Sequence, residues 1–185
     1  MDTVNQQQTV QEVELSWLAG FLEGDGSMQL TMVNSPKSAM GKAINVWVSF
    51  DNTDAAVINR IIDILDRYGV GHYDGQKFIK PIYKEDGSYY QSRIKICLFV
   101  RISKIQGVLK VLSGLSPYLT GQKKAQAEII MRFAKNRLKA KGRKNYESAD
   151  IMIVREFIEK RDGRYAAKNL ELLDRMLNDC TSDVA

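Results

Sequence analysis

The sequence predicts an α+β fold, a member of the broad α/β class, in which the elements follow the order αββαββα. Two observations lead to this class. Apolar residues first recur at helical spacing, at Leu15, Leu18 and Leu22, and then alternate as in a strand, at Met28 and Leu30. The same change of period occurs again later in the chain, and helices alone follow it. A helix and two strands, repeated once, predict a sheet covered by helices on one face.

The first part of the chain supplies a helix, two strands and a second helix. Ser16 can cap the first turn of the first helix. A loop containing Pro36 and Gly41 separates the two alternating strands, and Asp54 and Gly69 are placed to begin and end the next helix. We expect helices over residues 11–23 and 54–68, and strands over residues 27–34 and 43–51.

The second part supplies two strands and then helices. The later of these strands places Ile94, Ile96, Leu98 and Val100 on one face, which we expect to pack on helices. We expect strands over residues 70–83 and 89–101, and helices over residues 103–112, 120–138, 148–161 and 165–179. A single domain would span residues 1–185, with a core at about 11–138, a basic linker at 139–147 and a helical extension at 148–180.

Two features of the first helix need an explanation. Gly20 and Gly24 lie on one side of it, and each costs about 1 kcal/mol relative to alanine, which suggests that another backbone comes close. Glu23 and Asp25 lie at its carboxyl end, where free carbonyl groups disfavour negative charge. These carboxylates are either a solvated cap or, with the carbonyl oxygens, ligands of a hard cation such as Mg²⁺ or Ca²⁺. Gly26 is placed to take a left-handed turn after the helix.

The segment LAGFLEGDG, from Leu18 to Gly26, resembles the signature motif of the LAGLIDADG homing endonucleases. The match runs over nine consecutive residues, with a predicted helix before it and a predicted strand after it. The resemblance implies the αββαββα fold, with one four-stranded antiparallel DNA-binding sheet, for most of the chain. It constrains the last two helices least. In that family the motif helices pack side by side on their small residues.

The resemblance also implies a metal site. By position, Asp25 would hold a divalent ion together with the backbone carbonyl group of Gly24, whereas Glu23 occupies a place that is usually not a direct ligand. Mg²⁺ is the expected cofactor and Mn²⁺ a further candidate. Ca²⁺ is expected to support DNA binding with little cleavage, because it coordinates loosely and activates water poorly.

Two further catalytic residues are implied by the family. A polar residue just after the second strand often positions a water molecule; Asn52 fits this place, with Asp51 as the alternative. A lysine after a Pro-aromatic-Leu turn is also typical. The tetrapeptide Ser-Pro-Tyr-Leu precedes Lys123, and Gln122 and Lys124 are the alternatives if the alignment shifts by one residue.

The face of the predicted sheet opposite the apolar one carries polar side chains. The solvated side of an antiparallel sheet would explain them, but amide, hydroxyl and cationic groups on strands can also read base edges in the major groove of DNA. Trp47 does not suit a solvated face unless something covers it, and the resemblance implies that DNA does. The expected DNA contacts on this face are Gln29, Thr31, Asn45, Trp47, Ser49, Arg93 and Lys95.

The charge of the chain is unevenly distributed. The formal net charge is +5 and the sequence pI is about 9.1, which suggests an acidic partner. Between residues 121 and 146, nine lysines and arginines face only Glu128, so this segment alone carries +8. Scattered lysines are usually a solvated helix face, but an excess of this size favours phosphate binding. Lys139 and Lys141 are the phosphate contacts expected from it.

The chain contains one copy of the motif. Single-motif members of the family are homodimers, so the resemblance implies that Leu18, Ala19, Gly20 and Gly24 form the interface between two copies. The helix end would then bring Asp25 close to its symmetry mate. Two carboxylates at such a distance repel each other unless a metal ion neutralises them.

Composition argues against several other classes. Apolar residues make up 44% of the chain, so disorder is not expected. No segment resembles a signal peptide or a membrane span, so no membrane partner is expected. Cys97 and Cys180 are isolated, which fits an intracellular, reducing compartment and does not distinguish cytoplasm from organelle.

Together these features predict a site-specific double-strand DNA endonuclease of the homing type. It would bind a long pseudo-palindromic site as a homodimer and hydrolyse one phosphodiester bond in each strand, leaving short 3′ overhangs. An intron maturase that acts in RNA splicing and a DNA-binding regulator without cleavage activity are alternatives with the same fold. Asp25 is intact, which favours the nuclease. An unrelated RNA-binding α/β domain would require the motif match to arise by chance.

Overall fold

The computed structural model describes residues 2–36, 41–79, 82–83, 88–91, 94–140, 146–161 and 170–177. Within them, one four-stranded antiparallel sheet packs against helices, which confirms the α+β fold that the sequence predicts. In this described part of the chain, no helix has the length and apolar character needed to cross a membrane.

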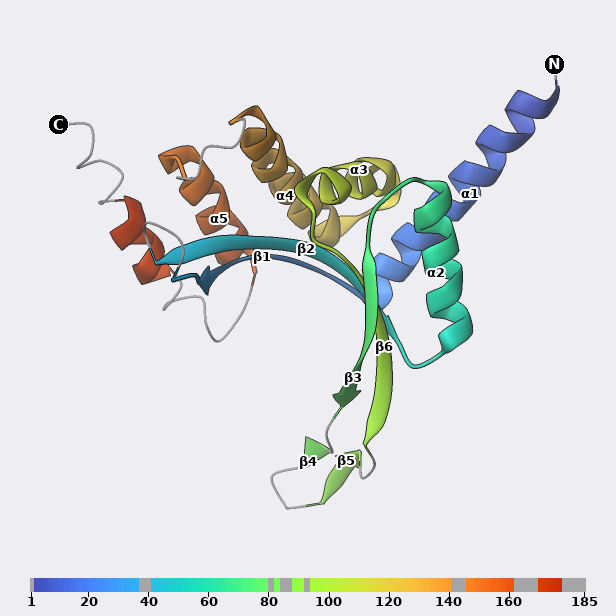
Figure 1. The fold of residues 1–185 in the computed structure, drawn as a ribbon, viewed down its shortest axis with the longest axis horizontal. Coiled ribbons are helices and arrows are strands. Elements are labelled where there is room, and N and C mark those ends of the chain that lie inside the picture. Colours follow the sequence, from blue (N-terminus) through green and yellow to red (C-terminus); the bar gives the residue numbers. More distant parts are fainter. Residues whose placement is uncertain are drawn as a thin grey trace.

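The main sheet has the strand order β1-β2-β6-β3, and every neighbouring pair is antiparallel. Its strands are β1 (Gly26–Asn34), β2 (Lys42–Asn52), β3 (Tyr73–Ile79) and β6 (Lys95–Ile102). A separate two-stranded sheet at the far end of the β3–β6 hairpin contains β4 (Ile82–Tyr83) and β5 (Tyr89–Gln91) (Figure 1). The two long strands expected in this region are therefore divided into four shorter ones.

The helices gather along the convex side of the curved sheet, with α2 beside β6 and with α4 and α5 above β1 and β2 (Figure 1). The helices are α1 (Asp2–Gly24), α2 (Ala55–Arg67), α3 (Ile105–Leu115), the short 3₁₀ helix η1 (Ser116–Tyr118), α4 (Gly121–Lys139) and α5 (Ser148–Lys160). A further helical segment covers residues 170–177.

The core lies between these helices and the inner face of the sheet. Leu18 and Leu22 of α1, Val48 and Phe50 of β2, and Phe133 of α4 are at most 2% exposed. Burying a large apolar side chain stabilises the fold by about 1.5–3 kcal/mol. The apolar stripe of α1 therefore fixes the motif helix firmly against the sheet.

The apolar face of β6 is not buried along its whole length. Val100 is fully buried and Leu98 packs against the core, but Ile94 and Ile96 are 63% and 51% exposed, and Phe78 of β3 is 65% exposed. The hairpin of β3 and β6 extends beyond the helices that cover the rest of the sheet (Figure 1). The expectation that Ile94 and Ile96 pack on helices is therefore wrong, because the helices do not reach them.

The motif helix differs from expectation at both of its ends. It begins at Asp2, so Ser16 lies inside it and donates to the carbonyl oxygen of Val13 (2.9 Å) instead of capping a first turn. Gly26 is not among the described glycines with positive φ and already belongs to β1. A Cβ atom on Gly26 would lie 2.6 Å from the Cα atom of Leu22. Close packing of β1 on the last turn of α1, and not a left-handed backbone, therefore requires this glycine.

We expect the Gly26→Ala substitution to destabilise the protein by about 1–3 kcal/mol, because the added methyl group overlaps the Leu22 backbone. Gly71→Ala is the control: a Cβ atom there would meet nothing within 4 Å, so its effect should stay within about 0.5 kcal/mol. Chemical denaturation measures both values. Equal stability of the two variants would show that the turn into β1 relaxes without cost.

Candidate functional site

The carboxyl end of α1 presents Asp25 at the surface. The backbone N–H of Asp25 donates to the carbonyl oxygen of Phe21 (2.9 Å), so Asp25 continues the last turn of the helix. Asp25 and the neighbouring Gly24 are both exposed. An exposed carboxylate beside the carbonyl groups of a helix end is a set of hard oxygen donors.

The other carboxylate of the motif has a different environment. Glu23 Oε1 accepts hydrogen bonds from the backbone N–H (2.5 Å) and the hydroxyl group (2.9 Å) of Thr120, the residue that precedes α4. These two bonds lower the pKa of Glu23, and the charge of Lys123 adds to the effect. Glu23 thus compensates the positive amino end of α4, which explains a carboxylate that is unfavourable at the end of its own helix.

The same helix brings Lys123 to the motif. Its Nζ atom donates to the carbonyl oxygen of Gly26 (2.6 Å), although 97 residues separate the two. Lys123 is half-buried, and burial lowers the pKa of its ammonium group. The charge of Arg161 lowers this pKa further, whereas Glu23 raises it. A desolvated cation therefore lies at the end of the motif.

The neighbours of Lys123 were the alternatives for this position. Gln122 Nε2 donates to the carbonyl oxygen of Lys160 (3.4 Å), and Lys124 is exposed. The hydrogen bond to Gly26 singles out Lys123 among the three residues. Its catalytic role stays a prediction.

The polar residues at the end of β2 divide between the two faces of the sheet. Asn52 Oδ1 accepts from the backbone N–H of Asp54 (2.8 Å), and the carboxylate of Asp54 accepts from Ala56 (2.8 Å) and caps α2 as expected. Asp51 lies on the other face, 3.1 Å from Nζ of Lys77. Asn52 thus forms the turn into α2, and its role in positioning water stays a prediction.

A single chain offers only part of a metal site. Within the described residues, no three His, Cys, Asp or Glu side chains come together as a possible metal-binding cluster. The available donors are the Asp25 carboxylate and backbone carbonyl oxygens such as that of Gly24. Their chemistry fits Mg²⁺, but the octahedral coordination of this ion needs further oxygens from outside one chain.

The face of the sheet turned away from the helices is called the open face below. The registers of the strands place on it Ser27, Gln29, Thr31, Asn45, Trp47, Ser49, Asp51, Tyr73, Lys77, Lys95, Cys97, Phe99 and Arg101. Ser49 is fully buried there, and its hydroxyl group donates to Asp51 (3.4 Å). The expectation that Ser49 contacts DNA is not supported, because the neighbouring strands and side chains cover it.

The other expected DNA contacts differ in accessibility. Thr31 is half-buried, whereas Asn45 and Lys95 are exposed on the open face. Arg93 and Lys141 lie outside the described residues. A ligand of the open face could therefore meet Thr31, Asn45 and Lys95.

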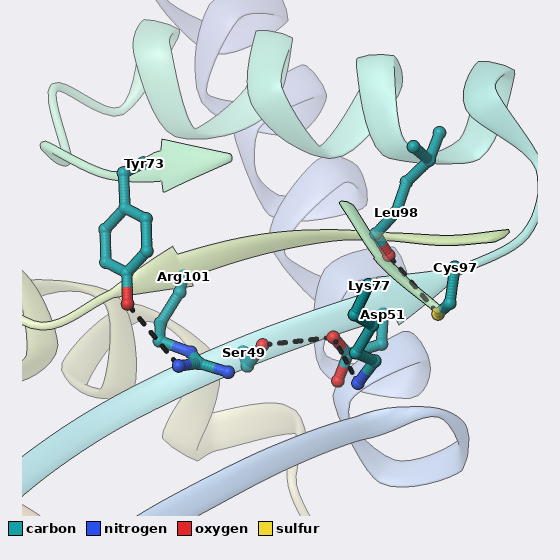
Figure 2. Close-up of polar contacts among 7 residues, drawn as sticks. All are labelled: Ser49, Asp51, Tyr73, Lys77, Cys97, Leu98 and Arg101. Atoms are coloured by element: carbon teal, nitrogen blue, oxygen red, sulfur yellow. Dashed lines mark hydrogen bonds and ion pairs between the residues drawn. The ribbon is translucent and has the colours of Figure 1, made fainter. Parts of the chain in front are cut away.

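Trp47 is partly covered by the protein itself. The guanidinium carbon of Arg101 lies 4.4 Å from the centre of the Trp47 ring and 5.2 Å from that of Phe99. Arg101 Nη1 also approaches the hydroxyl group of Tyr73 (3.5 Å; Figure 2). Cation–π contacts of this kind contribute about 0.5–2 kcal/mol. Arg101 therefore covers part of the Trp47 ring, which we expected DNA to cover.

Two cations of the open face, Arg101 and Lys77, were not predicted. Arg101 continues the alternation of Arg93 and Lys95 along one strand, so the same pattern could have identified it. Lys77 pairs with Asp51 of β2, and Figure 2 shows this pair beside Cys97. The pairing depends on strand order, which the sequence pattern of β3 does not reveal.

The basic segment is partly neutralised within the chain. Arg132 donates to the carboxylate of Glu156, and Arg137 Nη1 lies 3.0 Å from Asp150, with both side chains of the second pair largely buried. These two arginines join α4 to α5, so the net charge of the segment overstates its capacity for phosphate. Lys139 is exposed near the end of α4.

One side of α1 is exposed. Gly20 and Gly24 lie on it, and a Cβ atom on either would meet nothing within 4 Å. Val13 lies on the same side and is 58% exposed. Leu18 and Ala19 are fully buried in the core of this chain, so the expectation that they form an interface between two copies is not supported. The exposed strip of α1 consists of Val13, Gly20 and Gly24.

We expect Glu23→Gln to lower the melting temperature near neutral pH, because the charge of Glu23 strengthens its bonds to Thr120 at the amino end of α4. Since the pKa of Glu23 is lowered from 4.5, its stabilising effect is present above pH 4.5 and is lost as the pH falls through the folded-state pKa. The difference in melting temperature between the wild type and the variant should therefore shrink in acid. A difference that stays constant down to about pH 3 would contradict a role for the charge.

No protein-family model and no curated protein matches the sequence. Solved structures do resemble the chain. The homing endonuclease I-CvuI in complex with a DNA target is 20% identical, with 91% of this chain and 96% of that chain covered and a TM-score of 0.60. The archaeal intron-encoded homing endonuclease I-Vdi141I, complexed with DNA, is 14% identical, with 89% and 97% covered and a TM-score of 0.59.

A longer protein shows the same likeness. The LAGLIDADG meganuclease I-CpaMI, bound to uncleaved DNA, is 13% identical and has a TM-score of 0.56; the match covers 88% of this chain and 49% of that chain. The TM-scores show a common fold, and at identities this low they show the fold alone. The motif at the end of α1, the antiparallel sheet and the helices on its convex side agree with it. The chain has the fold of the LAGLIDADG homing endonucleases.

Proposed function

We propose that the protein is a site-specific homing endonuclease that cleaves double-stranded DNA as a homodimer with a divalent metal ion. The observation that carries this proposal is the arrangement at the end of α1, where Asp25 is exposed and Lys123 lies 2.6 Å from the carbonyl oxygen of Gly26. I-CvuI and I-Vdi141I share the fold and are homing endonucleases crystallised with DNA, which supports the same activity here.

The exposed strip of α1 supports the homodimer. Val13, Gly20 and Gly24 follow one another at helical spacing and face one direction. Glycines in a helix cost about 1 kcal/mol each, and the lack of side chains at Gly20 and Gly24 would compensate this cost by letting a second helix approach closely. A two-fold axis along the strip would bring the Asp25 carboxylates of the two copies together.

A metal ion would stabilise the two Asp25 carboxylates at the two-fold axis. Two neighbouring carboxylates repel each other, and divalent cations bound between them would remove the repulsion. When bound, such an ion supplies an activated water molecule and neutralises charge on the phosphate under attack. Mg²⁺ and Mn²⁺ suit oxygen donors. Complexes of I-CvuI with DNA were obtained in the presence of Ca and of Mg, which is consistent with a divalent ion here.

Residues of the chain itself would hold the substrate around this centre. Lys123 would stabilise the additional negative charge that develops on the phosphate, and an anion beside it would raise its lowered pKa again. Asn52 would orient the attacking water through its amide group. Glu23 would act indirectly, because its bonds to Thr120 fix α4 and thereby Lys123.

The open face would lie against the major groove, which admits a two-stranded ribbon. The polar side chains with accessible surface on it that could meet base edges or phosphates include Gln29, Thr31, Asn45, Lys95 and Arg101. Two-fold symmetry of the dimer would lead to a pseudo-palindromic site with one phosphodiester bond cut in each strand. The resemblance to the family implies that this site is long and that the cuts leave short 3′ overhangs.

We expect Asp25→Asn to lower the cleavage rate by at least about 100-fold, since even residues that only support metal ligands contribute 10- to 100-fold. Folding and specific DNA binding should persist, because Asp25 is exposed. Binding in Ca²⁺ and cleavage in Mg²⁺ of a duplex selected by the wild type measure the two properties. Asp63→Asn, which removes an exposed carboxylate from α2, is the control. Cleavage by Asp25→Asn at the wild-type rate would contradict the proposal, and loss of binding would assign Asp25 a structural role.

We expect Gly20→Leu to convert a dimer into a monomer, because four side-chain carbons would fill the space that a second helix needs. Gln11→Leu is the control, because it places a leucine on the opposite side of α1 and should leave the dimer intact. Sedimentation velocity distinguishes the two states, and cleavage should be lost with the dimer. A dimeric, active Gly20→Leu protein would show that the interface lies elsewhere.

A further inference from the structure

The carboxyl end of α5 reaches the open face of the sheet. Arg161, which directly follows α5, donates from Nη1 to the side-chain oxygen Oε1 of Gln29 in β1, across 132 residues of sequence. Gln29 is half-buried and lies opposite Trp47. The bond joins a helix whose role the sequence left open to a side chain that we expect to contact DNA.

Chemistry fixes which way the Gln29 amide faces. A guanidinium group has five N–H donors and no acceptor, so only the amide oxygen can bond to Arg161. The amide nitrogen occupies the other branch of the same planar group. Its two N–H donors are therefore directed away from Arg161.

The packing of α5 holds Arg161 in position. Phe157 is fully buried and Ile158 is 7% exposed, so the last turns of α5 are anchored in the core. Glu156 pairs with Arg132 of α4 and with Lys160 of α5. The anchored helix fixes the backbone position from which the Arg161 side chain reaches Gln29.

An engaged amide oxygen changes which base a glutamine can read. A free glutamine binds adenine with both groups, since its oxygen accepts from N6 and its nitrogen donates to N7. Arg161 takes one of the two lone pairs of the oxygen and holds that end of the amide, so the side chain then offers mainly its N–H donors. Guanine presents two adjacent acceptors, O6 and N7, in the major groove. Such a glutamine should favour guanine over adenine.

We infer that Arg161 is a specificity-determining positioning residue, which binds the amide oxygen of Gln29 and thereby makes Gln29 a donor that selects guanine at one base pair of the DNA site. The inference rests on the proposed function, because it requires the open face to lie in the major groove. Arg161 acts through Gln29 and does not itself need to touch DNA.

The test is selection of binding sequences from a pool of random DNA duplexes by the full chain in Ca²⁺. The Gln29→Ala variant identifies the base pair concerned, as the position whose preference becomes uniform. At this position the wild type should favour guanine. Arg161→Ala should shift the preference toward adenine by at least about fivefold, the lower limit of discrimination by a bidentate contact.

Two variants of Arg161 test the direction of the effect. Lysine is also only a donor, so Arg161→Lys should keep the preference for guanine. Glutamate only accepts, so Arg161→Glu should bind the amide nitrogen of Gln29 and turn its oxygen toward DNA. Preference should then move to adenine or cytosine, which present amino donors in the major groove.

Lys160→Ala is the matched control, because it removes the same charge one residue earlier, where the side chain pairs with Glu156. It should leave the base preference unchanged. An Arg161→Ala protein that binds all sequences more weakly but keeps its preference would overturn the inference and make Arg161 a phosphate contact. A Gln29→Ala protein with no altered position would overturn it as well.

The outcomes also separate this inference from the proposed function. If the wild type selects a sequence and cleaves it, while the variants of Arg161 show the wild-type preference, only the inference fails. If the wild type selects no DNA sequence, the proposed function fails and the inference fails with it.

Discussion

The contacts between the start of α4 and the end of α1 are the constraint on which the rest of the structure depends. Thr120 binds the carboxylate of Glu23, and Lys123 binds the carbonyl oxygen of Gly26, 97 residues away in each case. Gly26 allows β1 to leave the helix at once, because any side chain there would collide with Leu22. The direction of β1, the orientation of the open face and the exposure of Asp25 follow from this fixed turn. The acidic residues of the motif are therefore not equivalent, since one joins two helices and the other faces outward.

The period of the apolar residues predicted the order of the main elements because each helix and strand buries one face against a common core. This period could not predict how far along the sheet the helices cover its inner face. Ile96 alternates correctly on β6 and is still 51% exposed, because no described helix reaches that part of the hairpin. It also could not locate the start of α1 at Asp2, since the first turns of this helix are polar and give no apolar period.

The motif predicted where two candidate residues lie, but the sequence could not show which side chains are buried. Asp25 and Lys123 lie where the motif and the turn before α4 placed them. Leu18 and Ala19 belong to the same motif, but successive helical residues differ by 100° in direction, and these two face the core of their own chain. The capacity of the basic segment to bind phosphate was overestimated, because Asp150 of α5 neutralises Arg137 of α4. The sequence does not show that these two helices pack together.

The C-terminal region secures the hairpin of β1 and β2 at two places. β6 pairs with β2 only from Val48 to Asn52, so the earlier part of β2 has an edge without a neighbouring strand in the described sheet. The hydroxyl group of Tyr146, just before α5, accepts the backbone N–H of Ile44 on this edge (2.8 Å). An unpaired N–H would cost free energy and leave the hairpin of β1 and β2 free to bend. Arg161 holds the same hairpin through Gln29 at the other end of α5. The N-terminal motif thus positions the groups proposed for chemistry, while α5 holds the strands proposed to read the DNA sequence.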